Sequence, residues 1–311
     1  MIISAGLPSA PGTPTVIKAQ TDSSQITVTW TATSDNGGTA ITSYEVWYNQ
    51  GPITNTFIVN SEVSSATTTE TITSVASGDP YIVKIVAKNR LGSSEDSGSV
   101  TVYAASVPDA PQAPSRVAGT NAQTTIDIEW TANGNGGSGI TGYEVWWNGG
   151  GEGPVTGLKV EISSGSTTST QITGLSPGTY YGFAIKAVNI VGPGSLSSET
   201  SLIAATVPEK PAHLSLVSQS ETEITVTWEP SIDTGGTPIT GYKLQWSENS
   251  GSMAELDYTV PSSASSYTVD ASTNSVQVGA SYSFLVISVN VVGDSDPSDI
   301  LEDIVAGTPP G

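Results

Sequence analysis

The side chains that carry most enzymatic chemistry are scarce in this sequence. Its 311 residues contain one histidine, His213, and no cysteine. A nucleophilic pair needs a base beside its serine or cysteine, and zinc sites draw several ligands from histidine and cysteine. A single histidine, placed at the start of a predicted strand, favours a surface position. We therefore predict no catalytic residue, no cofactor and no enzymatic activity.

The densest run of carboxylates lies near the C-terminal end, where Asp294, Asp296 and Asp299 are followed by Glu302 and Asp303. Hard cations such as Ca²⁺ take carboxylate oxygens as ligands. The run lacks the frame of an EF-hand, and a solvated loop leading into the last strand is the alternative interpretation. Asp294, Asp296 and Asp299 are thus a candidate for weak calcium binding, and no other metal site is predicted.

The net charge of −20 arises from 29 acidic and 9 basic residues. Such a surface repels nucleic acid, so we do not expect nucleic acid to be a partner. Residues 208–311 contain fourteen acidic and two basic side chains, hence −12 of the total. No apolar run approaches the roughly 20 residues that span a bilayer, and we predict no membrane span.

An internal repeat organises the chain and positions every motif within it. A proline-containing linker recurs with a period of 100 residues, at Pro8, Pro108 and Pro208. After each linker comes an alternating apolar and polar run that ends in tryptophan: residues 26–30, 126–130 and 224–228. Alternation with β-branched residues predicts a half-buried strand whose isoleucine, valine and tryptophan point inward and whose polar residues, such as Thr27, point outward.

Two further signatures follow in every repeat. Glycine-containing turns lead into a second strand that is expected to begin at Ile41, Ile140 and Ile239. Later, a tyrosine six residues after an apolar residue precedes a third alternating strand, at Tyr81, Tyr181 and Tyr282. This spacing is typical of a tyrosine corner, in which the ring packs and the hydroxyl caps nearby backbone.

Together the three signatures resemble the fibronectin type III family over essentially the whole chain. The resemblance implies an all-β fold of three tandem immunoglobulin-like, seven-stranded antiparallel β-sandwiches. It also implies that Trp30, Trp130 and Trp228 are core residues of strand B, and that strand F begins at Tyr81, Tyr181 and Tyr282.

The repeat predicts the domain boundaries as well. Residues 1–7 look like the end of a preceding repeat or an N-terminal strand, and residues 309–311 like the start of a next linker. The expected domains are residues 8–107, 108–207 and 208–308. Because short proline-containing linkers disfavour helix and stiffen the joints, we expect a semi-rigid rod on the order of 100 Å long.

Alternation along the second strand places one tryptophan of each of the first two domains on the outside. If Tyr44 and Val46 point inward, Trp47 points outward, and Trp146 does the same in the second domain. The third domain has Gln245 at this position. Trp47 and Trp146 are therefore candidates for contact with protein or glycan, unless a loop or a neighbouring strand covers them.

These features favour a non-enzymatic structural array, a segment of an extracellular filament, stalk or surface coat that assembles through linkers, termini and exposed aromatics. The expected partners are other protein chains, including copies of itself, or a glycan, and the expected location is extracellular or at the cell surface. An adhesion or carbohydrate-binding accessory module of a surface protein or secreted enzyme is the alternative. An intracellular scaffold like the giant muscle proteins is compatible with the absence of cysteine.

Overall fold

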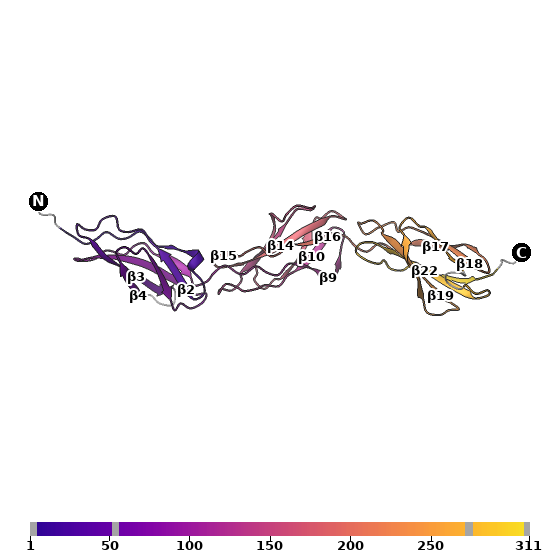
Figure 1. Cartoon of the computed structure of the whole chain (residues 1–311), viewed down its shortest axis with the longest axis horizontal. Helices are drawn as coiled ribbons and strands as arrows, with labels where there is room; N and C mark the ends of the chain where they lie inside the picture. The colour runs from indigo at the N-terminus through magenta and orange to yellow at the C-terminus, as the bar shows by residue number, and fades with distance from the viewer. Residues whose placement is uncertain (1–4, 52–55, 271–275, 308–311) are drawn as a thin grey trace.

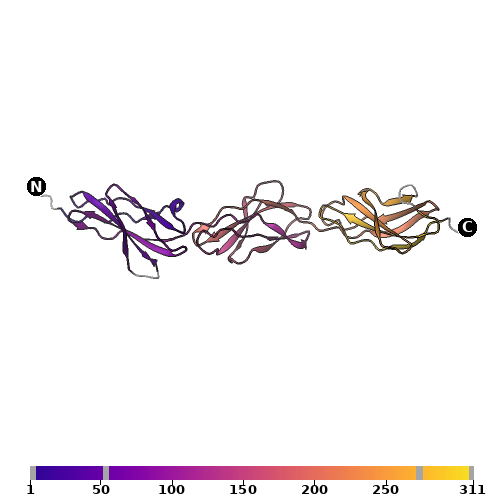
Figure 2. The ribbon, with the colours of Figure 1, turned by 60° about the horizontal axis from the view of Figure 1, so that its bottom comes forward.

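The computed structural model describes residues 5–51, 56–270 and 276–307. It consists of β-sandwiches arranged end to end, with the two chain ends at opposite extremes (Figure 1). The turned view keeps the same extended line (Figure 2). Across these ranges no helix is long and apolar enough to cross a membrane. Residues 1–4 of the predicted N-terminal segment, Thr308 and the predicted linker at 309–311 lie outside the described residues.

The first domain packs a sheet in the order β1-β2-β5 against a sheet in the order β4-β3-β6, to whose last strand both β7 and β8 pair. All pairings are antiparallel. Its elements are β1 (Thr15–Val16), η1 (Lys18–Gln20), β2 (Gln25–Thr29), β3 (Ile41–Gln50), β4 (Ile58–Ser64), β5 (Thr69–Thr73), β6 (Pro80–Asn89), β7 (Gly92–Ser93) and β8 (Val100–Tyr103).

The second domain repeats this topology, with sheets β9-β10-β13 and β12-β11-β14, the latter extended by β15 and β16 on β14. Its first strand is longer than that of the first domain. The elements are β9 (Ser115–Asn121), β10 (Thr125–Glu129), β11 (Gly142–Trp147), β12 (Gly157–Ile162), β13 (Ser169–Thr173), β14 (Tyr180–Asn189), β15 (Gly192–Pro193) and β16 (Thr200–Ile203).

The third domain has sheets β17-β18-β21 and β20-β19-β22-β23. The two sheets again enclose one apolar core. The elements are β17 (Ala212–Gln219), β18 (Glu223–Glu229), β19 (Gly241–Glu248), β20 (Ala254–Pro261), β21 (Ser266–Asp270), β22 (Ser281–Val289) and β23 (Leu301–Val305). The structure thus confirms an all-β fold of three two-sheet sandwiches.

The aromatic residues of the predicted motifs meet in the centre of each sandwich. Trp130 is 6% exposed and packs edge-on against Tyr143, with ring centroids 5.3 Å apart. Tyr181 stacks on Trp147 with an interplanar angle of 8°. Equivalent edge-on pairs join Trp30 to Tyr44 and Trp228 to Tyr242, and equivalent ring contacts join Tyr48 to Tyr81 and Trp246 to Tyr282.

The tyrosine corner has the expected hydrogen bond in every domain. The Tyr181 hydroxyl accepts the backbone N–H of Ser176 at 2.9 Å. The Tyr81 and Tyr282 hydroxyls accept the N–H groups of Ala76 and Gln277, each at 2.7 Å. Because the ring is buried while its oxygen reaches a turn, one side chain ties the turn to the core.

Two local expectations were wrong. The second strand begins at Gly142 and Gly241 in the later domains, not at Ile140 and Ile239, whose side chains pack against the cores ahead of the strand. Thr27, expected to face solvent from alternation, is 1% exposed. Its hydroxyl donates to the Gln20 carbonyl at 3.0 Å, because the η1 turn folds over this face of β2.

Replacing the corner tyrosine in Tyr181→Phe should destabilise the second domain by about 1–3 kcal/mol, because the Ser176 N–H loses its acceptor. Hydrogen exchange of the β14 amides in the intact chain measures this free energy. Tyr180→Phe is the matched control, since Tyr180 is 47% exposed. Equal acceleration of exchange in both variants would contradict the role of the buried hydroxyl.

Candidate functional site

Trp146, predicted to point out of its sheet, is half-buried on β11, whereas its neighbour Trp147 packs against the core. The indole Nε1–H of Trp146 donates to Glu144 Oε2 at 2.8 Å. The ammonium of Lys186, from the adjacent strand β14, lies 4.3 Å from the indole centroid. Trp146 is therefore held between an anion in its own strand and a cation from the next.

Trp47 has the same arrangement on β3, with longer distances to its anion and cation. Its Nε1–H donates to Glu45 Oε2 at 3.1 Å, and the Lys84 ammonium lies 5.8 Å from its ring centroid. Lys84 also lies 4.2 Å from the Phe57 ring and forms an ion pair with Asp96 at 2.6 Å. The Lys84 ammonium therefore interacts both with two aromatic rings and with a carboxylate.

A lysine over an indole contributes about 0.5–1 kcal/mol at an exposed site and occupies that ring face. A sugar that stacked on the same face of Trp146 would have to displace Lys186. Gln245, the third-domain residue, lies at the equivalent place on β19, opposite Leu285 of β22. Contact of Trp47 and Trp146 with a partner stays a prediction.

Charged groups beside Trp47 extend this outer-face network. Lys88 forms ion pairs with Glu45 and, at 3.5 Å, with Glu62. The hydrogen bond with Glu45 raises the pKa of Lys88 above its ordinary value. A hydrogen bond from the Ser43 hydroxyl, helped by Lys88, lowers the pKa of Glu62. Since Glu62 is favoured in its ionised form, its contribution to stability is present above its ordinary pKa and is lost as the pH falls.

The predicted calcium ligands are not gathered into a cluster. Asp294 pairs with Lys243 at 2.6 Å, and Asp299 pairs with Lys210 at 2.5 Å. Within the described ranges no group of three or more acidic, histidine or cysteine side chains is arranged to hold a metal ion. Asp294 and Asp299 therefore each share their charge with a lysine, and Glu302 and Asp303 lie in strand β23.

His213, the histidine considered for chemistry, lies at the surface. It is 76% exposed, and its Nδ1 lies 2.6 Å from Glu229 Oε2. Its backbone has a φ of +50°. The exposure of the imidazole agrees with the surface position predicted for His213.

The most elaborate polar arrangement lies instead at the joints between domains. Asn189, at the end of β14, is 4% exposed. Its Nδ2 donates to the carbonyl of Ser106 in the linker at 2.8 Å and to that of Asn135 at 2.9 Å. Its Oδ1 accepts the N–H of Val191 at 2.9 Å. One buried amide thus ties the incoming linker to two loops of the domain it enters.

The same arrangement recurs at the start of every domain. In each case an asparagine after the third alternating strand donates to one linker carbonyl and one turn carbonyl. The equivalent contacts are Asn89 to Gly6 at 2.8 Å and Asn36 at 3.0 Å, and Asn290 to Thr206 at 2.8 Å and Thr234 at 2.9 Å.

Each linker is also bound on its other side, by the domain that it leaves. The Ala104 N–H donates to the Asp79 carbonyl of the first domain at 3.0 Å, and the Ser106 N–H donates to the Gly136 carbonyl of the second at 2.8 Å. Ala105, between them, is 2% exposed. The second joint repeats these bonds, from Ala204 to Thr179 at 3.0 Å and from Thr206 to Gly235 at 2.9 Å. One residue separates the anchors, so little of either linker is free to bend.

Glycines let the turns of adjacent domains approach closely. A Cβ on Gly78 would lie 2.8 Å from the Gly137 carbonyl oxygen, and a Cβ on Gly178 would lie 2.3 Å from that of Gly236. All four have positive φ. Any side chain at Gly178 would therefore collide with backbone across the joint.

Side chains add one polar contact to each joint. The Ser77 hydroxyl donates to the Gly137 carbonyl at 2.8 Å. At the second joint, Gln123 Nε2 donates to the Asp233 carboxylate at 2.8 and 3.0 Å. Sequence reasoning predicted the linkers and stiff joints but missed the contacts that hold them, although the recurring Asn-x-x-Gly spacing at Asn189 and Gly192 was a visible signal.

Gly178→Ala should reorient the second and third domains, because its new Cβ has no room beside Gly236. Residual dipolar couplings from the two domains measure the angle between them. Gly279→Ala is the matched control, since Gly279 has the same kind of turn, with a φ of +81°, and nothing within 4 Å of an added Cβ. The importance of the close approach is refuted if both variants keep the wild-type angle.

Comparison with known proteins gives a consistent family match. A family model described as the fibronectin type III domain matches residues 9–103, 109–203 and 209–304. The FN1–FN3 domains of chicken CNTN1 share 19% identity with a TM-score of 0.41, over 97% of this chain and 100% of that one.

Three curated relatives align with most of the chain. Exoglucanase B of Cellulomonas fimi is 29% identical over 90% of this chain and 26% of its own length. Fibronectin type-III domain-containing protein 3A of Homo sapiens is 27% identical over 98% of the chain and 24% of its own. Neogenin of Rattus norvegicus is 28% identical over 95% and 21%. The chain spans about a quarter of the length of these relatives.

Proposed function

We propose a non-enzymatic structural role for this chain, which belongs to the fibronectin type III family: a stiff three-domain spacer in an extracellular filament, stalk or surface coat. Tandem domains of this family are generally non-catalytic modules. The observation that carries the proposal is the double anchoring of each linker, exemplified by Ala104 on one domain and Ser106 on the next. A spacer transmits length only when its joints resist bending, and these bonds oppose bending.

The charge distribution supports an exposed, well-solvated array. The net charge of −20 keeps copies apart laterally, because like-charged surfaces repel at distances below the Debye length. The third domain holds most of this charge. Any association between copies would therefore favour ends and apolar surface over side-to-side packing.

The names of the relatives are compatible with more than one setting. One is an exoglucanase and another is neogenin, and the aligned part is about a quarter of each. Their activities belong to those proteins. A spacer role is the property that a shared tandem module would contribute in either setting.

Small-angle X-ray scattering of the intact chain tests stiffness. We expect a rod on the order of 100 Å, and we expect the double variant Asn189→Ala, Asn290→Ala to broaden the distribution of shapes, because both linkers lose their buried donors. Each lost buried hydrogen-bond set should also cost about 1–3 kcal/mol of domain stability.

Asn89→Ala is the control for that loss of stability. It removes the same bonds from Gly6, which precedes the first domain, and leaves both joints intact. A wild-type ensemble as broad as that of the double variant would overturn the spacer proposal. Electron microscopy at rising concentration adds the test of filament assembly: ordered end-to-end polymers are expected, and isolated rods at every concentration contradict assembly.

A second function, an adhesion or carbohydrate-binding accessory module, is favoured by Trp47 and Trp146, which occupy equivalent outer-face positions one domain apart. Two aromatic rings in series suit an extended glycan. For this function, Trp47→Ala with Trp146→Ala should abolish retention on insoluble glucan in a pull-down, while Gln245→Ala in the third domain should not. Unchanged retention in the tryptophan variant would exclude these rings as the contact.

A further inference from the structure

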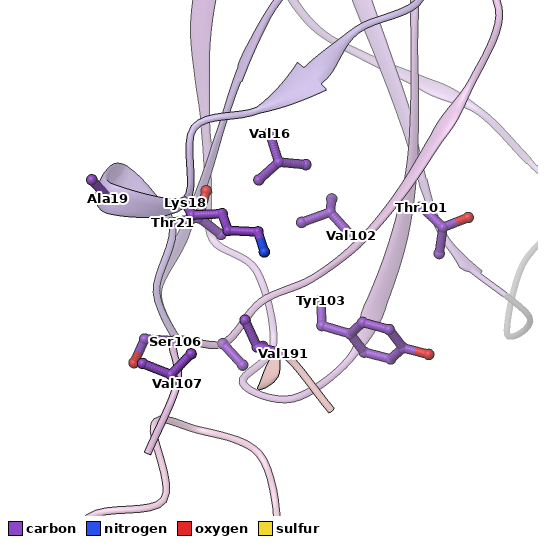
Figure 3. A pocket seen from close by; sticks show the side chains of 11 residues that line it. Val16, Lys18, Ala19, Thr21, Thr101, Val102, Tyr103, Ser106, Val107 and Val191 are labelled. Carbon is purple, nitrogen blue, oxygen red and sulfur yellow. The ribbon is translucent and has the colours of Figure 1, made fainter. Parts of the chain in front are cut away.

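An apolar cavity of about 410 Å³ lies where the first domain meets the second (Figure 3). Its walls come from the first and last strands of the first domain, from the linker and from the loop after β14. The side chains that line it include Val16, Lys18, Val102, Tyr103, Val107 and Val191. Since Val191 belongs to the second domain, the cavity closes only when the two domains are joined.

The cavity exists because the first domain departs from the repeat at its first strand. Strand β1 ends at Val16, and the η1 turn follows, whereas β9 and β17 continue for seven and eight residues. The three repeats also differ at the position that follows the linker proline by eight residues. In the second domain this is Arg116, whose guanidinium donates to the carbonyls of Thr120 and Ile203.

In the third domain the same position is Leu216, which packs against the core. Arg116 thus spans the space between the first and last strands of the second domain, and Leu216 is likewise a longer side chain than valine. Val16 is shorter and leaves that space open beside Val102. The cavity therefore results from the short first strand and small side chain of the first domain, not from the sandwich fold in general.

One cation is directed into this apolar space. Lys18 is an exposed residue that lines the cavity, and Figure 3 shows its side chain extending toward Val102 and Val191. Lys18 takes part in none of the ion pairs formed by the described residues.

We propose that this cavity binds a small amphipathic carboxylate, with its apolar body between Val16, Val102 and Val191 and its carboxylate on Lys18. Ligand sites are commonly about 300–1,000 Å³, mostly apolar, with few polar groups that fix orientation. A carboxylate supplies the negatively charged partner that the Lys18 ammonium lacks, and an apolar body displaces water from the valine side chains.

Occupancy also affects the joint. The ligand touches the first domain through Val16 and the second through Val191, with linker residue Val107 alongside. A molecule that contacts both domains binds best when they hold one orientation, so binding shifts the joint toward that orientation. The site thus couples a small molecule to the stiffness of the rod.

Decanoate is the probe, titrated into the intact ¹⁵N-labelled chain below its aggregation concentration. We expect saturable shifts of amides around Val16, Tyr103 and Val191, and at least tenfold weaker binding of decanol. Lys18→Gln should weaken decanoate binding about tenfold and leave decanol unchanged. Lys159→Gln, in the second domain away from the cavity, is the control and should leave both unchanged.

Val16→Arg introduces the residue that the second domain has at this position, and Val16→Leu that of the third. Both should abolish binding by filling the cavity, and dispersed amide signals from the core strands β2, β3 and β6 report that the first domain remains folded. If Val16→Arg does not fold, the binding measured for Val16→Leu provides the test. Absence of saturable binding to the wild type, equal affinity for decanol, or undiminished binding by the filled variants would each overturn the proposal.

Discussion

A polypeptide that passes from one β-sandwich to the next leaves both sheets, and its backbone N–H and C=O groups must find partners elsewhere. This requirement governs the whole molecule. Asn189 meets it by donating to the Ser106 carbonyl from a buried position, and the turn glycine Gly136 accepts from the same residue. These hydrogen-bond partners of the linker belong to the folded second domain. The bonds that satisfy the linker backbone therefore also fix the orientation of the second domain relative to the first.

Variation on one repeated plan accounts for the features that distinguish the domains. The cores are conserved in kind, with an edge-on tryptophan–tyrosine pair in each. What changes is the outside: Gln245 replaces the outer tryptophan, and Val16 stands where Arg116 bridges to the last strand. Changes at such positions cost little core packing. They are therefore the places where a tandem array acquires functions that its fold does not require.

Local periodicity located strands and their inward faces, and the resemblance of the repeated motifs to the fibronectin type III family supplied the sandwich fold. Alternation in residues 126–130 oriented Trp130 inward, and the spacing to Tyr181 predicted a hydroxyl that caps a nearby turn, as the 2.9 Å bond to Ser176 confirms. These inferences succeeded because each depends on residues close in sequence, where a side-chain period of two leaves one choice of face. The exception at Thr27 arose when a separate turn covered the outer face.

The sequence by itself therefore determined the number of domains and the inward position of the tryptophan and tyrosine of each core. Only the tertiary structure decided which distant residues meet: Lys186 over the Trp146 ring, Asn189 on a linker residue 83 positions earlier, and Val16 beside Val191 in one cavity. Periodicity reports which way a side chain points, but not which distant segment arrives opposite. That choice depends on sheet pairing and domain docking, which bring together residues that no local pattern relates.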